Sequence, residues 1–256
     1  SWTDTAPAKG TYREILKWGA PDVFKHPNKR LYAMMKKVFN MTDADFKKKE
    51  KEGNSPVSVQ IPAKMDQKHL DALTAIVGKE NANTDTYSRL KYAYGKTMID
   101  AMRLRDGVIE NIADIVLHPR GKDDVVKIVN YCNEHKIAVY PVGAGSSVTR
   151  GNECVKGGVS LAMATHMNRV LEINETNQTI TVEPGIYGPA YEELLNNAPE
   201  KLGTKGRYTG GHFPQSFEFT TVGGWIAALG SGQQSSYYGD AYHIVVGQEI
   251  VTPAGT

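Results

Sequence analysis

The residues best suited to chemistry lie in a short loop at 141–147. The loop contains Gly143 and Gly145, and Ser146 and Ser147 follow them. Consecutive backbone N–H groups without bulky side chains can converge on an anion, and the serine hydroxyls add further donors. The loop therefore predicts a phosphate-binding site, although a tight turn between two elements has the same glycine pattern.

A nicotinamide dinucleotide site would need a different sequence after this loop. Its fingerprint is G-x-G-x-x-G at the start of a helix, with an acidic residue after the next strand. Residues 152–158 read Asn-Glu-Cys-Val-Lys-Gly-Gly, which is a poor helix sequence. The sequence therefore argues against a nicotinamide-binding Rossmann fold.

A second region rich in small residues lies at 210–232. It contains His212 after a glycine pair, Trp225 after the pair Gly223 and Gly224, and then Gly230-Ser231-Gly232. Two small-residue loops in one domain are typical of a long ligand that runs close to the backbone, and the alternative is a turn and a closely packed helix. His212 is a candidate proton donor, although a lone histidine is more often structural, and Trp225 is more often a core residue.

Strands and helices alternate around the first loop. Residues 115–117 and 137–140 are predicted strands, and the helix between them is capped by Asp123 or Asp124 and buries Val125, Ile128, Val129 and Cys132. Such a strand-helix-strand unit places the following loop at the carboxyl edge of a sheet. The later predicted elements are strands at 159–163, 170–173, 179–183, 244–246 and 249–251, and helices at 187–195 and 222–229, with a hairpin at 170–183.

We expect a helical region before residue 111 and place a domain boundary there, between 1–110 and 111–256. Leu70, Leu73 and Val77 recur at helical spacing, and a further helical run from Leu90 to Met102 is weakened by Gly95.

The first 66 residues are polar and rich in lysine, and they are predicted to form a basic arm. Lys36-Lys37 and Lys47-Lys48-Lys49 flank a short apolar set at 34–39. A solvated helix face is the simpler interpretation of this charge, and contact with an anionic membrane surface or an acidic partner is the alternative.

Composition and charge indicate which kinds of ligand and which cellular location to expect. The chain has 256 residues, is 40% hydrophobic and carries a formal net charge of +2, which favours small-molecule chemistry over nucleic-acid binding. Cys132 and Cys154 have no metal-ligand spacing, so we predict free thiols and no metal site. No leader pattern or run of about 20 apolar residues is present, and we expect a cytoplasmic protein.

Ordered matches along the chain carry a family resemblance. They lie at 113–119, 123–129, 141–147, 167–171, 182–186, 218–225 and 251–253. Through them the sequence resembles the FAD-binding domain of the vanillyl-alcohol oxidase / p-cresol methylhydroxylase (PCMH-type) superfamily, and within it the alkyldihydroxyacetonephosphate synthases and their prokaryotic relatives. The resemblance implies an α+β fold, with a FAD-binding domain of two α/β subdomains preceded by a helical N-terminal arm.

The resemblance also implies FAD as the cofactor and three segments that hold it. These are the pyrophosphate loop with Pro141, Val142, Gly143, Ala144, Gly145, Ser146 and Ser147, then Gln215, Ser216, Phe217, Glu218, Phe219, Thr220 and Thr221, and finally Ala228, Leu229, Gly230 and Ser231. Some relatives attach the flavin covalently through a histidine in the glycine loop, which this loop lacks, so we predict non-covalent FAD. The family's substrate-binding cap and catalytic residues would lie beyond Thr256, so no catalytic residue is named.

Three positions depart from the synthase pattern and affect the predicted reaction. Gln215 stands where an acidic residue is usual, Leu229 where an arginine is usual, and Ala144 where a third glycine is common. An arginine near a flavin provides positive charge for an anionic reduced ring or an anionic substrate, and leucine does not.

These departures favour a FAD-linked oxidoreductase that takes a hydride equivalent from an alcohol or a hydroxy acid. The alternatives are a redox-neutral ether-lipid synthase with a lipid-like substrate, and the flavin-binding subunit of a split enzyme. We expect either a homodimer or a second subunit that carries the cap.

Overall fold

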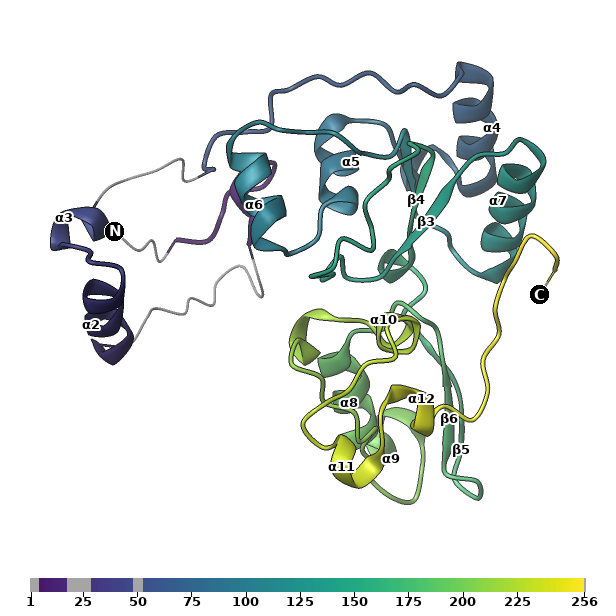
Figure 1. Ribbon diagram of the computed structural model, residues 1–256. Coiled ribbons are helices and arrows are strands. Elements are labelled where there is room, and N and C mark those ends of the chain that lie inside the picture. Colours follow the sequence, from purple (N-terminus) through teal and green to yellow (C-terminus); the bar gives the residue numbers. More distant parts are fainter. Residues whose placement is uncertain (1–4, 18–28, 48–52, 256) are drawn as a thin grey trace.

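The computed structural model describes residues 5–17, 29–47 and 53–255 of the chain, and its elements form three successive groups (Figure 1). The first group is mainly helical: α1 (Tyr12–Leu16), α2 (Lys29–Val38), α3 (Asp43–Lys47), α4 (Gln67–Val77), η1 (Lys79–Asn81), β1 (Ala82–Asn83), α5 (Thr86–Ala93) and α6 (Met98–Arg105). The second contains the main strands: β2 (Ile115–Leu117), α7 (Lys122–Glu134), β3 (Val139–Val142), β4 (Val159–Ala162) and η2 (Met163–Thr165). The third is a hairpin with short helices: β5 (Val170–Asn174), β6 (Thr179–Val182), α8 (Gly188–Asn196), α9 (Ala198–Leu202), η3 (Phe217–Phe219), α10 (Val222–Ala227), α11 (Ser235–Tyr238) and α12 (Ala241–Ile244).

A four-stranded sheet in the order β1-β2-β4-β3 forms the first of two lobes, which we call the sheet lobe. Strands β2, β4 and β3 are parallel, with Val159 of β4 opposite both Ile115 of β2 and Val139 of β3, whereas β1 pairs antiparallel with β2. Loops that follow parallel strands leave a sheet at the same edge. The predicted strand-helix-strand unit is confirmed, and the glycine loop leaves β3 at this carboxyl edge.

Helices cover both faces of this sheet. On one face α4 and α7 pack together, and Leu73, Ile128 and Leu161 belong to a single buried cluster there. On the other face α5 contacts β2 and β4, and Leu90 belongs to a second buried cluster. Burial of apolar side chains on both faces is what stabilises a parallel sheet.

The second lobe, which we call the hairpin lobe, runs from β5 to α12 and lies below the sheet lobe in Figure 1. The predicted hairpin is confirmed, with Ile173 opposite Ile180. An ion pair between Arg169 and Glu183 holds the base of the hairpin. The N–H, Nε and Nη2 of Arg169 donate to the buried Glu183 carboxylate at 2.9, 3.0 and 2.7 Å. These bonds hold the pKa of Glu183 below its usual range. Together the two lobes confirm the predicted α+β class.

The strands predicted at 244–246 and 249–251 are wrong. Ile244 ends the short helix α12, and the segment 245–251 pairs with no other strand of the described chain. Asp240 and His243 form a capping box that begins this helix. Val246 is 86% exposed, so this apolar side chain does not pack against a sheet.

Smaller differences concern the ends of elements. The strand predicted at 137–140 lies two residues later, at Val139–Val142. The helix α7 begins after Gly121, and Asp124 does not cap it, because its carboxylate accepts hydrogen bonds from the N–H, Nε and Nη2 of Arg120. The helical run from Leu90 to Met102 is two helices, α5 and α6, with Gly95 between them.

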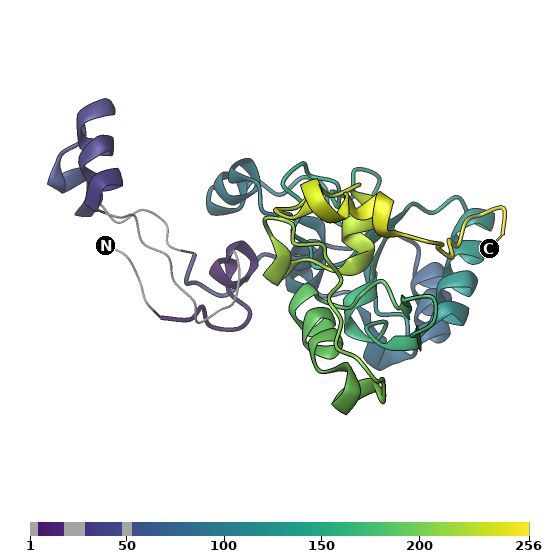
Figure 2. The same ribbon diagram turned by 90° about the horizontal axis from the view of Figure 1, so that it is seen from below.

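The α2–α3 pair stands away from both lobes in the two views (Figures 1 and 2). The Tyr32 ring contacts Phe46 in a tilted arrangement with ring centroids 4.5 Å apart, and Lys36 pairs with Asp43 at 2.6 Å. Phe39 is 64% exposed.

The lysine cluster at 47–49 falls partly outside the described residues, and the membrane contact of the basic arm stays a prediction. Within the described residues no helix is both long and apolar enough to span a bilayer.

Candidate functional site

The glycine loop presents a row of open backbone donors. Pro141 and Val142 are the last residues of β3, and Gly143 to Ser147 form the loop itself and are half-buried. The N–H groups of residues 143–148 donate to no acceptor in the described part of the chain. Gly145 has a φ of 67°, a left-handed conformation of the kind found in backbone anion nests. This geometry suits an anion.

Ser147 is held by the turn that follows it. Its Oγ accepts hydrogen bonds from the N–H of Thr149 at 3.3 Å and of Gly151 at 2.9 Å. With both bonds accepted, the hydroxyl hydrogen of Ser147 is the donor that it can offer to a ligand.

The second predicted segment meets this loop through Thr221. A Cβ on Gly143 would overlap Thr221 Oγ1, so only glycine lets the Thr221 side chain lie this close to the backbone of the loop. Thr221 is 1% exposed, and its Oγ1 accepts the N–H of Gly224 at 3.4 Å and so caps α10. The structure therefore joins 143–147 and 217–221, two regions that are distant in sequence.

Four other residues of the segment 215–221 are either exposed or in contact with Trp225. Gln215 and Glu218 are exposed, whereas Phe217 stacks on Trp225 with ring centroids 6.0 Å apart. Thr220 accepts a hydrogen bond from Trp225 Nε1. Trp225 is 6% exposed, so its interpretation as a core residue is confirmed.

The third predicted segment, residues 228–231, ends α10. The N–H of Gly230 donates to Trp225 O at 2.8 Å, and Leu229 adopts a left-handed φ of 50° with its side chain 63% exposed. The Ser231 side chain donates to Asp240, which helps to hold the pKa of that carboxyl below its usual range. The contacts of this segment are with α10, His212 and α12.

His212 lies in the core of the hairpin lobe. It is 4% exposed, its ring stands edge-on to Trp225 at 5.1 Å, and neither ring nitrogen has a hydrogen-bond partner among the described residues. Burial lowers its pKa, so the ring is neutral near pH 7. Because both ring nitrogens lack a partner among the described residues, the structure supports neither a hydrogen-bonded structural role nor proton donation, and the role of His212 stays a prediction.

Sequence reasoning missed the contact between Gly95 and the loop. A Cβ on Gly95 would overlap Ser147 O, and the next N–H, of Lys96, donates to that oxygen at 2.7 Å. The Lys96 side chain donates to Ile15 O, and burial lowers its pKa to about 8. The sequence feature that could have revealed this contact is Gly95 itself, because a glycine inside a helical pattern often marks the close approach of another segment.

Both cysteines are buried free thiols, as predicted. Burial raises the pKa of Cys132 to about 11 and also raises that of Cys154. Neither thiol therefore ionises near neutral pH.

Comparison with known proteins identifies the family. A family model described as a FAD binding domain matches residues 113–256. The chain belongs to this FAD-binding family. FAD is therefore its cofactor, and the predicted resemblance is confirmed.

The relatives of this FAD-binding chain include enzymes with different reactions. It is 32% identical to an alkyldihydroxyacetonephosphate synthase of Trypanosoma brucei brucei, over 90% of this chain and 37% of that protein. It is 29% identical to the glycolate oxidase subunit GlcD of Bacillus subtilis (strain 168), over 72% of this chain and 36% of that protein. A solved alkyldihydroxyacetonephosphate synthase is 31% identical with a TM-score of 0.70, covering 77% of this chain and 35% of that one. The chain thus spans about a third of the length of these relatives.

Proposed function

We propose that residues 143–147 bind the FAD pyrophosphate, with 217–221 as the facing wall. The observation that carries this proposal is the row of open N–H groups at 143–148, held beside Thr221 by the close approach at Gly143. A pyrophosphate is a strong hydrogen-bond acceptor, and a concave row of backbone donors binds it without a cationic side chain. Residues 228–231 complete the proposed set at the end of α10.

The proposed attachment is non-covalent. Residues 141–147 contain no histidine, and His212 is enclosed in the hairpin lobe core. Acid precipitation of the purified protein should release the yellow cofactor into the supernatant. Colour retained in the washed pellet would contradict non-covalent binding.

For the reaction, we infer oxidation of an alcohol or a hydroxy acid. Bound FAD supplies a hydride acceptor, and the residues of this chain bind and orient it. The three proposed FAD segments contain one ionisable side chain, Glu218, and no arginine or lysine. A phosphate-bearing substrate would be held best by an arginine or lysine near the flavin, because charge-assisted hydrogen bonds to phosphate are the strong ones, and these segments offer neither.

An ether-lipid synthase reaction is the second candidate. Its support is the similarity to alkyldihydroxyacetonephosphate synthases in both sequence and structure. Sequence identity alone does not separate the candidates, because a D-lactate dehydrogenase of Arabidopsis thaliana is also 32% identical over 57% of this chain.

One experiment distinguishes the two reactions. The full-length protein is mixed without oxygen with a panel of alcohols and hydroxy acids, and separately with acyl-dihydroxyacetone phosphate and a long-chain alcohol. An oxidoreductase loses its visible flavin absorbance with a member of the first panel. Formation of the alkyl product without loss of flavin absorbance would establish the synthase and contradict the oxidoreductase.

A further inference from the structure

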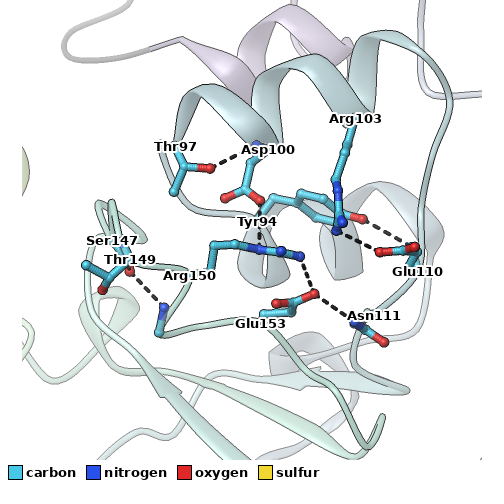
Figure 3. A network of polar contacts seen from close by, with 11 residues as sticks. Tyr94, Thr97, Asp100, Arg103, Glu110, Asn111, Ser147, Thr149, Arg150 and Glu153 are labelled. Atoms are coloured by element: carbon cyan, nitrogen blue, oxygen red, sulfur yellow. Dashed lines mark hydrogen bonds and ion pairs between the residues drawn. The ribbon is translucent and has the colours of Figure 1, made fainter.

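An ion pair connects helix α6 to the segment that follows the glycine loop (Figure 3). Asp100 projects from the first turn of α6, and its Oδ1 lies 3.4 Å from Arg150 Nε. The carboxylate is almost fully enclosed, since Asp100 is 3% exposed. A buried carboxylate needs a nearby cation, and Arg150 is the one that pairs with it in the described structure.

Arg150 is itself fixed by several contacts. Its backbone has a left-handed φ of 62°, which residues other than glycine adopt rarely and at a cost in free energy. Its Nη2 pairs with Glu153, and Glu153 also accepts a hydrogen bond from Asn111 Nδ2 at 2.7 Å. Arg150 therefore joins α6 to the turn at 149–153.

The turn at 149–153 holds the glycine loop through Ser147. The N–H of Gly151 donates to Ser147 Oγ at 2.9 Å, and the N–H of Lys96 donates to Ser147 O at 2.7 Å. Ser147 is thus held on one side by the turn that Arg150 anchors and on the other by the chain that leads into α6. Residues 95–100 lie outside the range 113–256 that the family model matches.

We propose that Asp100 is a positioning residue of the FAD site, acting through Arg150 on the loop at 143–147. A row of N–H groups binds a pyrophosphate well only when the groups already converge, because ordering a loose loop costs conformational free energy upon binding. Loss of the Asp100 carboxylate frees Arg150 and the turn at 149–153, and the loop then samples conformations in which its N–H groups diverge. The inference rests on the proposed position of FAD.

The test is a FAD titration of the apoprotein, with the full-length wild type and the Asp100→Asn variant. Glu110→Gln is the matched control, because it makes the same carboxylate-to-amide change in an exposed ion pair with Arg103 of α6, at 2.6 Å. We expect Asp100→Asn to raise the Kd for FAD about tenfold, which is about 1.4 kcal/mol. We expect the control to stay within about twofold of the wild type.

Two further variants keep the test decisive if Asp100→Asn does not fold. Arg150→Gln removes the same ion pair from its other side and should weaken FAD binding in the same way, whereas Gly121→Ala, where a Cβ meets nothing within 4 Å, should not. The melting temperature of each apoprotein is measured in parallel.

The outcomes separate a positioning role from a structural one. A raised Kd for Asp100→Asn and Arg150→Gln, with both controls near wild type, supports the proposal. A lower apoprotein melting temperature with an unchanged Kd overturns it, because the network is then only structural. A wild type that binds no FAD overturns the proposed function as well.

Discussion

At the scale of single residues, two glycines lie where another group comes too close for a side chain. Gly143 faces Thr221 Oγ1, and Gly95 faces Ser147 O. The sequence shows these glycines, but the partner of each lies on another element. The glycine loop could therefore be recognised from its own residues, and its phosphate-binding role stays a prediction, whereas the Gly95 contact and the Asp100–Arg150 pair could not be recognised.

His212 leads to a prediction about acid stability. Burial holds its folded-state pKa below the ordinary histidine value of about 6.5, so below about pH 6.5 the unfolded chain binds more protons than the folded protein. The stabilising contribution of neutral His212 is complete above about pH 6.5 and declines as the pH falls toward the folded-state pKa. Urea unfolding of His212→Phe should show a smaller loss of unfolding free energy than the wild type between about pH 7.5 and 5.5.

Part of this acid sensitivity should remain in the variant. His118 is 8% exposed, and burial lowers its pKa too, so it contributes a loss of the same sign over the same pH range. An identical pH dependence in His212→Phe and the wild type would show that His212 does not titrate as its burial requires.

At the scale of elements, α10 explains how the hairpin lobe is held together. Thr221 caps its N-terminus, and a Cβ on Gly223 would lie 2.5 Å from Pro184 Cβ, so this glycine lets the helix pack closely against the end of β6. The apolar period and the glycine pair predict a helix from 222 correctly, although the structure ends it at Ala227. The strands predicted at 244–246 and 249–251 are wrong because a strand needs a partner strand, and an apolar run does not show whether one is available.

The C-terminal end of α10 carries a strained leucine, which gives a stability prediction. Leu229 occupies the left-handed position after the helix, where glycine has no steric cost. We expect Leu229→Gly to raise the unfolding free energy of the apoprotein by about 0.5–1 kcal/mol in urea unfolding. Leu229→Ala keeps the Cβ and is the control, expected within a few tenths of the wild type; equal effects of the two changes would contradict this explanation.

At the scale of the whole molecule, the structure connects two lobes at the edge where β3 ends. The sheet lobe supplies the open N–H groups of 143–147, and the hairpin lobe supplies Thr221 beside them. The family resemblance was readable from the sequence because its motifs are local. The meeting of the two lobes was implied by the resemblance alone, because it depends on tertiary packing that local patterns do not encode.

The most direct test of the FAD site is a titration of apoprotein with FAD, comparing the wild type, Gly143→Ala and Gly121→Ala. A methyl group at 143 would overlap Thr221 Oγ1 and displace the loop, whereas at 121 it meets nothing within 4 Å. We predict that Gly143→Ala raises the Kd for FAD at least about a hundredfold, or about 2.7 kcal/mol, and that Gly121→Ala leaves it unchanged. Equal FAD affinity in Gly143→Ala and the wild type would contradict the placement of the pyrophosphate on this loop.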